Sequence, residues 1–194
     1  MGYKIVVADD EPIIRMDICE MLKLAGYDVV GQASNGLEVI EKCKLYKPDL
    51  AILDIKMPNL DGLKATKIIM EENLSSAVII LSAYSGEEFI ERAKEAGAIG
   101  YVVKPITEMG LLAEVGVTIT RGIEIRKMKE EIQKVKEEME KRKLLERAKG
   151  VLMSKYNYSE NDAYSKIRKL SMDKRCPIQE IAEKILNGNI MVHK

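Results

Sequence analysis

The sequence predicts an α/β domain built on a five-stranded parallel sheet, followed by a long helix and a small domain of three helices. Short apolar segments alternate with amphipathic ones five times between residues 4 and 105, which is typical of a parallel sheet covered by helices on both faces. Residues 108–147 then contain no proline and are rich in charge, which favours a long helix.

Charge supports a division of the chain. Residues 1–120 carry 12 Lys+Arg against 19 Asp+Glu, whereas residues 141–194 carry 13 against 6. An acidic first part and a basic last part favour two domains, the second suited to a polyanion, although ordinary solvated charge is the alternative. We expect a first domain over 1–120, a coiled-coil connector over 121–141 and a helical output domain over 142–190.

The composition argues against a membrane-spanning protein, a metal or redox cysteine site and a catalytic histidine. No apolar run approaches the roughly 20 residues of a membrane-spanning helix, so we expect a cytoplasmic protein without a membrane partner. Cys19, Cys43 and Cys176 lack metal or redox spacing and are expected to be reduced thiols. His193, the single histidine, is expected to be a frayed terminal residue with no catalytic role.

The elements of the first domain follow from local patterns. Pro12 suits the first turn of a helix whose apolar residues recur at helical spacing until Gly26 ends it. Short runs of apolar residues, some without alternation, predict the strands. The expected strands are 4–8, 28–33, 50–53, 77–83 and 100–103, and the further helices lie near 37–43, 63–72 and 87–96.

Polar residues fall where these strands end. Asp9 and Asp10, Asp54, Ser82 and Lys104 each follow a different strand, and such ends meet at one edge of a parallel sheet. Carboxylates that close together require a cation, and Mg²⁺ suits oxygen ligands and phosphate. A lysine and a hydroxyl would complete a phosphoryl-binding site in which the carboxylate of Asp54 attacks phosphorus. The alternative is that Asp54 merely caps a turn.

These residues resemble the receiver domain of bacterial response regulators. The resemblance rests on Asp9-Asp10, on the segment Asp54–Gly62, on Ser82-Ala83 and on Tyr101–Pro105. It implies a flavodoxin-like fold and phosphorylation of Asp54 by a histidine kinase in another protein. It further implies the following roles: Mg²⁺ on Asp9 or Asp10, Asp54 and the backbone carbonyl of Lys56; a phosphoryl-binding and switch set of Ser82, Ala83, Tyr101, Lys104 and Pro105; and a cis bond between Lys104 and Pro105. For Tyr101 the alternative is an amphipathic surface ring.

The connector carries an apolar seam. Its members alternate by three and four residues, as in a coiled coil, and they are Ile125, Met128, Ile132, Val135 and Met139. The next positions, Arg142 and Glu146, are polar, so the pattern lapses there. We expect pairing with a second copy of the chain over about 125–139; packing on the same chain is the alternative.

The output segment is expected to contain three helices. The first carries Leu144 to Lys155 and is broken at Asn157-Tyr158, and Ser159 to Asp162 resembles a capping box. The second is expected to bury Ala163, Tyr164, Ile167 and Leu170. Pro177 opens the third and Gly188 ends it. The polar side chains left over from this core are Arg147, Lys149, Lys166, Arg168, Lys169, Ser171, Lys174 and Arg175, which would contact phosphates or stack on bases, or else form a solvated surface.

The pieces Ala148-Lys149-Gly150 and Ala163–Arg168 are similar to an ANTAR domain. That resemblance implies dimers that bind paired RNA hairpins in leader transcripts and prevent a terminator from forming, with Gly150 part of the RNA-binding set. The order of the two domains is similar to that of ethanolamine-utilisation antitermination regulators. The alternatives are a DNA-binding transcription factor and a phosphorylation-driven protein-interaction module. No enzymatic output is expected, because no catalytic set lies beyond the first domain.

Overall fold

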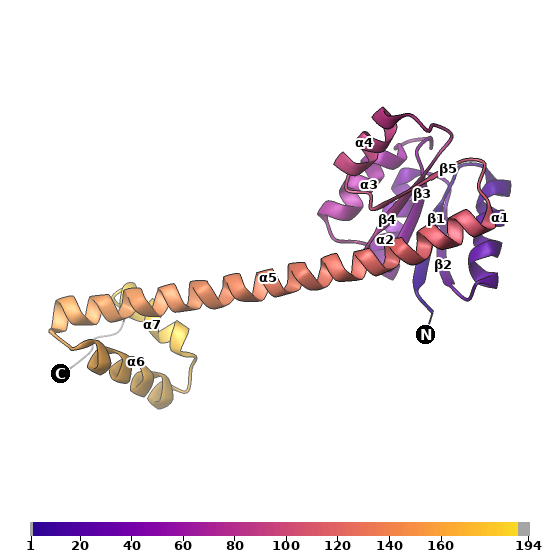
Figure 1. Ribbon diagram of the computed structural model, residues 1–194. Helices are drawn as coiled ribbons and strands as arrows, with labels where there is room; N and C mark the ends of the chain where they lie inside the picture. Colours follow the sequence, from indigo (N-terminus) through magenta and orange to yellow (C-terminus); the bar gives the residue numbers. More distant parts are fainter. Residues whose placement is uncertain (1, 190–194) are drawn as a thin grey trace. The chain divides into compact units, whose positions relative to one another are not determined.

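The computed structural model describes residues 2–189 of the 194-residue chain, so His193 lies outside the described residues. The strand order is β2-β1-β3-β4-β5 and every neighbouring pair is parallel, which confirms the predicted sheet (Figure 1). The strands are β1 (Lys4–Ala8), β2 (Asp28–Ala33), β3 (Leu50–Asp54), β4 (Val78–Ser82) and β5 (Gly100–Val103). The helices are α1 (Pro12–Leu24), α2 (Gly36–Tyr46), α3 (Gly62–Glu71), α4 (Glu87–Glu95), α5 (Glu108–Tyr156), α6 (Glu160–Lys174) and α7 (Ile178–Leu186).

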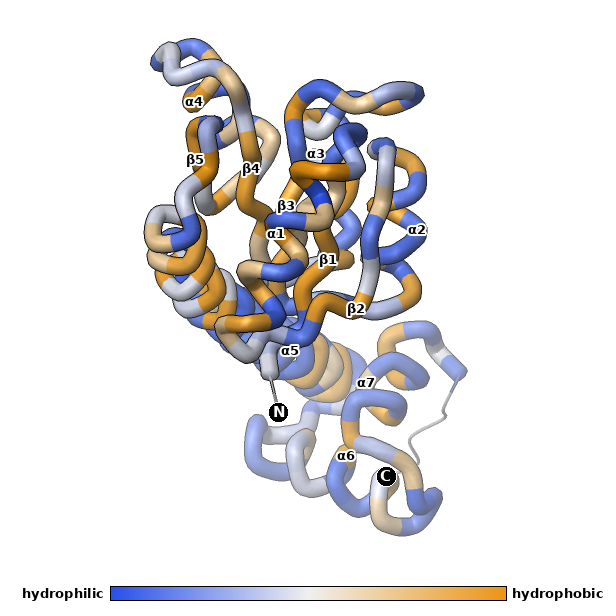
Figure 2. The backbone as a smooth tube through the Cα atoms, turned by 90° about the vertical axis from the view of Figure 1, so that its right-hand side faces the viewer, coloured by the Kyte–Doolittle hydropathy of each residue, from blue (hydrophilic) through white to orange (hydrophobic). Residues whose placement is uncertain are grey.

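The central strands of the sheet, β1, β3 and β4, are buried on both faces. Val6, Leu53 and Ile80 belong to a core that includes residues of α2, α3 and α4, whereas Val7 and Ile79 belong to a core formed with α1 and the start of α5. Because alternate residues of one strand point to opposite faces, a strand covered on both sides is apolar throughout. This accounts for the apolar runs in the sequence, visible as orange along β1 and β4 in Figure 2.

The chain divides into two compact units between Met128 and Lys129, and α5 continues through this boundary as one helix. The first part of α5 contributes Leu111, Val115 and Ile119 to the core that the sheet forms with α1. The second unit has a core of its own, to which α5 contributes Ala148 and Leu152. The first predicted output helix is therefore the end of α5, without a break at 141/142. Within residues 2–189 no helix is long and apolar enough to cross a membrane.

One residue of α6 that was predicted to be buried is exposed in the structure. Tyr164 is 42% exposed, whereas Ala163 and Ile167 are fully buried. The buried positions of this helix are four residues apart, and a residue one position further on points about 100° away from them. The predicted break and cap are confirmed: Asn157 has a φ of 56°, and the Ser159 hydroxyl accepts a hydrogen bond from the backbone N–H of Asp162.

Candidate functional site

One lysine joins three strand ends at the carboxyl edge of the sheet. The Nζ atom of Lys104, just after β5, lies 2.9 Å from Oδ2 of Asp9 and 2.6 Å from Oδ1 of Asp54. Both carboxylates are almost completely buried. An unpaired buried carboxylate is strongly disfavoured, so the shared ammonium ion is what allows two such groups to lie at one edge.

The position of Asp54 is fixed by the loop that follows it. Its Oδ2 accepts a hydrogen bond of 2.6 Å from the backbone N–H of Lys56. Helix α3 begins directly behind it, and a Cβ atom on Gly62 would lie only 1.9 Å from the carbonyl oxygen of Asp54. Asp54 therefore also organises a turn, as the simpler interpretation proposed, and only glycine fits at position 62.

Burial raises the pKa of the Asp54 carboxyl, and the hydrogen bond and charge of Lys104 offset only part of that effect. For Lys104 burial acts to lower the pKa, but hydrogen bonds to Asp54 and Asp9 outweigh it and hold the pKa above its usual range. Lys104 is thus a permanent cation, and Asp54 is less readily ionised than an exposed aspartate.

A hollow of about 290 Å³ opens beside these groups. Its lining includes Asp10, Asp54, Lys56, Ser82 and Lys104. Asp10 is exposed, unlike Asp9, and within residues 2–189 no three acidic, His or Cys side chains are close enough to hold a metal by themselves. The expectation of three converging carboxylates is therefore modified, because Lys104 lies between two of them.

The oxygen donors at the hollow still suit Mg²⁺. This ion typically takes one or two protein carboxylates and keeps several waters. Asp9 or Asp10 together with Asp54 and the carbonyl of Lys56 are hard oxygen ligands of that kind, and an open hollow leaves room for water and a phosphoryl group. The donor set fits the metal.

The two predicted switch residues both contact the backbone of Tyr84. The Ser82 hydroxyl is buried and accepts a hydrogen bond of 3.0 Å from the N–H of Tyr84. The Tyr101 hydroxyl donates a hydrogen bond of 2.7 Å to the carbonyl of Tyr84. The Tyr101 side chain is half-buried against the core that includes residues of α2, α3 and α4. Ala83, between Ser82 and Tyr84, is exposed. The predicted cis bond between Lys104 and Pro105 is confirmed.

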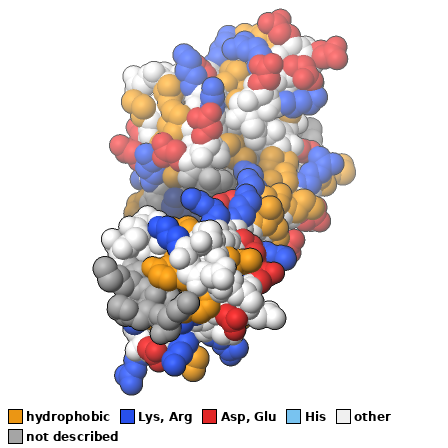
Figure 3. All heavy atoms as spheres, turned by 90° about the vertical axis from the view of Figure 1, so that its left-hand side faces the viewer, with side chains coloured by type: hydrophobic (Ala, Val, Ile, Leu, Met, Phe, Trp, Pro, Cys, Tyr) orange, Lys and Arg blue, Asp and Glu red, His pale blue; other side chains and the backbone are white. Residues whose placement is uncertain are grey.

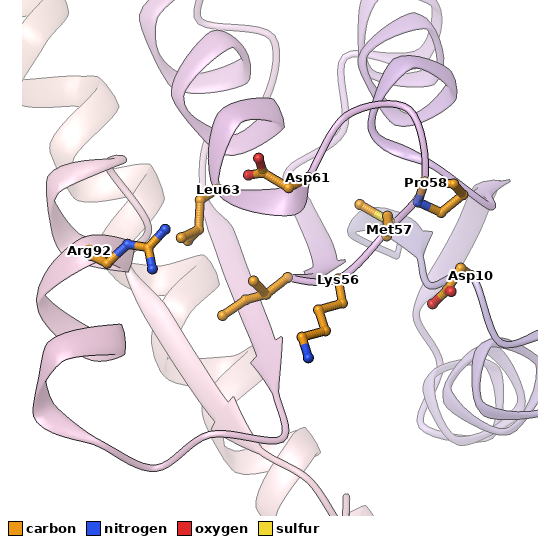
Figure 4. Close-up of a pocket in the computed structure, with 8 residues that line it drawn as sticks. Asp10, Lys56, Met57, Pro58, Asp61, Leu63 and Arg92 are labelled. Carbon is orange, nitrogen blue, oxygen red and sulfur yellow. The ribbon is translucent and has the colours of Figure 1, made fainter.

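Sequence reasoning missed a stack of side chains at the rim of the hollow. The rings of Tyr84 and Phe89 lie 4.4 Å apart and nearly parallel, with Lys56 over the first and Arg92 over the second. Arg92 of α4 and Asp10 stand on opposite sides of a neighbouring hollow of about 490 Å³, with Lys56 between them (Figure 4). The sequence signal that could have found this stack is the tyrosine two residues after Ser82. Its stacking partner, Phe89, depends on the tertiary fold.

The structure revises one member of the predicted RNA-binding set. Lys149 is only 8% exposed and its Nζ lies 2.7 Å from Glu160 and 2.9 Å from Glu146. It therefore joins α5 to the first turn of α6 and is not a side chain left over from the core.

The other members of the set differ in exposure. Ser171 and Lys166 are half-buried, and the Ser171 hydroxyl donates a hydrogen bond to the carbonyl of Cys176. The exposed members are Arg147, Gly150, Arg168, Lys169, Lys174 and Arg175. On the face drawn in Figure 3, Lys and Arg lie among acidic and hydrophobic side chains.

The predicted seam of α5 is exposed. Ile125 is 39% exposed, and the other four side chains (Met128, Ile132, Val135 and Met139) are between 53% and 60% exposed. The seam is therefore not packed on its own chain in this structure.

Two family models match the chain. The response regulator receiver domain matches residues 5–116, and the ANTAR domain matches residues 133–186, a range that begins inside the predicted connector. The chain belongs to the response regulators that combine a receiver domain with an ANTAR domain, a phosphorylation-regulated class. A relative from Mycobacterium tuberculosis (strain ATCC 25618 / H37Rv), the transcriptional regulatory protein PdtaR, is 39% identical over 183 residues, which cover 94% of this chain and 89% of the relative.

Solved structures match the receiver part. The signal receiver domain of the response regulator NarL from Mycobacterium tuberculosis is 30% identical, with a TM-score of 0.56, and the match covers 59% of this chain and 93% of that one. A CheX–CheY–BeF3–Mg complex from Borrelia burgdorferi is 25% identical, with a TM-score of 0.55 and coverage of 58% and 86%. The resemblance to ethanolamine-utilisation regulators is not tested by these matches.

Proposed function

We propose that this protein is a phosphorylation-activated regulator that binds paired hairpins in leader transcripts and prevents transcription termination. The observation that carries the phosphorylation part of the proposal is the Lys104 ammonium ion held between the buried carboxylates of Asp9 and Asp54, beside an open hollow, and the RNA part rests on the match to the ANTAR domain. A nucleophile, a permanent cation and oxygen donors at one edge suit phosphoryl transfer. The partners are a histidine kinase, RNA and a second copy of the chain.

The phosphoryl acceptor is Asp54. A carboxylate oxygen of Asp54 attacks phosphorus of the phosphohistidine of a kinase, so that a P–O bond forms, the P–N bond breaks and the leaving imidazole takes a proton. Lys104 stabilises the negative charge on the phosphoryl oxygens. The hydrogen bond from the N–H of Lys56 keeps the attacking carboxylate oriented toward the hollow.

Bound Mg²⁺ would neutralise charge on the phosphoryl group during transfer. Asp9 or Asp10, Asp54 and the Lys56 carbonyl would hold it. The Mg²⁺ named for the Borrelia CheY complex supports this assignment for a related receiver.

Phosphorylation is proposed to act through Ser82 and Tyr101. A phosphoryl oxygen on Asp54 is a charged and therefore strong acceptor, so the Ser82 hydroxyl, which lines the same hollow, would turn to donate a hydrogen bond to it. The hydrogen bond from the Tyr84 N–H to Ser82 would then be lost, and Tyr101 would lose its fixed acceptor on the same residue. The result is a shift between two receiver states that favours pairing of the connectors.

The output is proposed to bind RNA through the exposed basic side chains of the second unit. Arginine planes stack on unpaired bases, and lysines contact phosphates. Two output units in one dimer would hold two hairpins together and gain affinity through effective concentration. The transcriptional role in the name of the Mycobacterium tuberculosis relative is in keeping with this proposal.

A filter-binding titration tests the proposal. The full chain is titrated with a paired-hairpin leader RNA and with a duplex DNA of equal length, with and without Mg²⁺ and acetyl phosphate, and Asp54→Asn serves as the unphosphorylated control. Tighter RNA binding by the phosphorylated protein alone is expected. If the protein binds the duplex DNA more tightly than the RNA, it is a DNA-binding regulator. If it binds neither nucleic acid at low salt, its output partner is a protein.

A further inference from the structure

Tyr164 is the one tyrosine of the described second unit whose ring the fold does not use. Tyr156 and Tyr158 are half-buried, pack against the core of that unit and lie with their rings 6.5 Å apart. Tyr164 is 42% exposed. Within residues 2–189 its ring forms no stack or cation–π contact and its hydroxyl forms no hydrogen bond. The ring is therefore available to a partner.

Arg168 lies one helical turn beyond Tyr164 on α6 and is also exposed. Residues four positions apart share a helix face and are separated by about 6 Å along its axis. Within the described chain Arg168 forms no ion pair. The reason lies in the sequence, because the residues three and four positions away are Tyr164, Ser165, Ser171 and Met172, and none of them is acidic. A flat cation and a flat ring thus stand together, both without partners.

This face of α6 favours a negatively charged ligand. Its other exposed members are uncharged: Asn161, Ser165 and Met172. Glu160, one turn before Tyr164, has its Oε1 atom 2.7 Å from the Nζ of Lys149, so its charge is balanced. Lys169 is exposed and forms no ion pair within residues 2–189. Aromatic and basic side chains combined in this way suit a polyanion that also presents bare bases, since bases stack and phosphates are attracted to lysine.

We propose that Tyr164 and Arg168 hold one unpaired base of an RNA loop between them, the ring on one face of the base and the guanidinium plane on the other. Flat groups in contact are about 3.5 Å apart, so a base between two of them needs about 7 Å. Side chains that start about 6 Å apart along the helix can open to that distance by rotating about their χ angles.

This pair would make the output select hairpin loops over double-stranded RNA. A base in a duplex is already stacked between its neighbours and cannot enter the space between the two side chains, whereas an unpaired loop base can. The inference rests on the proposed function, in which the second unit binds RNA. It adds Tyr164, which is not one of the basic side chains assigned above, as the residue that distinguishes a loop from a duplex.

Fluorescence tests the stacking directly in the full chain. The sequence contains no tryptophan, so Tyr164→Trp introduces a single reporter. With Mg²⁺ and acetyl phosphate present, the hairpin RNA should quench its emission because the indole stacks on a base, and a duplex RNA of equal length should not. Tyr3→Trp, at a position of the first unit that is 46% exposed, is the matched control and should respond to neither RNA. Hairpin binding by Tyr164→Trp without quenching would overturn the inference.

Affinity measurements test the contribution of the ring. In the filter assay Tyr164→Leu should weaken hairpin binding about 10-fold, whereas Tyr164→Phe should stay within about twofold of the wild type because it keeps the ring. Arg168→Lys keeps the charge but loses the plane and should also weaken binding. Tyr3→Leu is the control. Circular dichroism verifies that each variant is folded, and duplex RNA should bind all of them equally. Equal hairpin affinities of Tyr164→Leu and the wild type would contradict the inference.

Removal of single bases from the RNA identifies the bound nucleotide. Hairpins that each lack one loop base should show one position at which the wild type loses about 10-fold in affinity. Tyr164→Leu should lose nothing further at that position, because the base and the ring contribute through the same contact. If Tyr164→Leu loses as much as the wild type at every loop position, the ring is not in contact with a base.

These results separate this inference from the proposed function. If the wild type prefers the hairpin RNA while Tyr164→Leu binds it equally well, the stacking inference alone fails. If the wild type binds duplex DNA more tightly than the hairpin, or binds neither, the proposed function fails and the inference is overturned with it.

Discussion

The Nζ atom of Lys104 lies 2.6 Å from Oδ1 of Asp54, and so links the ends of β5 and β3 across β4, which lies between them. The same ammonium ion reaches Asp9 at the end of β1. A single cation therefore connects three strands at the edge where phosphoryl transfer is proposed. A change in the charge of Asp54 therefore alters the electrostatic environment of Lys104, which directly follows β5 and precedes the cis bond to Pro105.

Asp54→Asn should abolish phosphorylation without lowering the free energy of unfolding at pH 7. The pKa of Asp54 is raised in the fold from 3.8, so its favourable contribution is present below pH 3.8 and is lost as the pH rises through the folded pKa. At pH 7 the buried, ionised carboxylate destabilises the fold, and an uncharged asparagine removes this cost of burying a charge. Urea denaturation and mass spectrometry after acetyl phosphate treatment measure the two effects. Asp28→Asn, at an exposed position, should be phosphorylated normally.

Lys104→Ala should leave two buried carboxylates without a counter-charge. Removing one partner of a buried ion pair costs about 3 kcal/mol, and we expect a loss of that order in Mg²⁺-free buffer. Mg²⁺ should raise the melting temperature of this variant more than that of the wild type, since it replaces the missing charge. Equal shifts in calorimetry would argue against the assigned magnesium ligands.

Gly62→Ala and Gly116→Ala should have opposite effects on stability. A Cβ atom at position 62 would lie 1.9 Å from the carbonyl oxygen of Asp54, whereas one at position 116, also within a helix, meets no atom within 4 Å. We expect Gly62→Ala to lower the free energy of unfolding by about 2 kcal/mol. Gly116→Ala should raise it by about 0.5–1 kcal/mol, because alanine is the better helix former. Chemical denaturation of both variants checks the pair.

Gly150→Ala separates folding from RNA binding. A Cβ atom at position 150 meets no atom within 4 Å, so the fold gives no reason for glycine near the C-terminal end of α5, and alanine should stabilise the chain slightly. If RNA approaches the helix at this position, the added methyl group should weaken binding several-fold in the filter assay. Unchanged affinity would remove Gly150 from the proposed interface.

The sheet and its polar edge could be predicted because both follow from local patterns. Strands β3 and β4, and β1 after Lys4, are buried throughout and their buried parts are almost entirely apolar. A carboxylate or lysine directly after a strand can lie only at its carboxyl edge. Asp9, Asp54 and Lys104 were placed together on that ground, and Lys104 contacts both carboxylates.

The errors arose where burial depends on packing between distant segments. Lys149 is buried because Glu160, beyond the turn after α5, lies within reach, and no helical period signals that contact. Tyr164 lies one position off the buried face of α6. The seam lapses at Arg142, where the connector was expected to end, and α5 continues through this position, because a helix does not require an apolar seam to persist.

The uninterrupted α5 also restricts how such proteins can recombine during evolution. Leu111 near its start belongs to one core and Leu152 near its end to another, so the chain has no loop at which a receiver could be exchanged without altering the helix. Insertion of one residue into the connector would turn everything beyond it by about 100° and would move half of the seam off its line. Insertion of seven would keep the seam intact. Lengths of this segment in working recombinants should therefore differ by whole heptads.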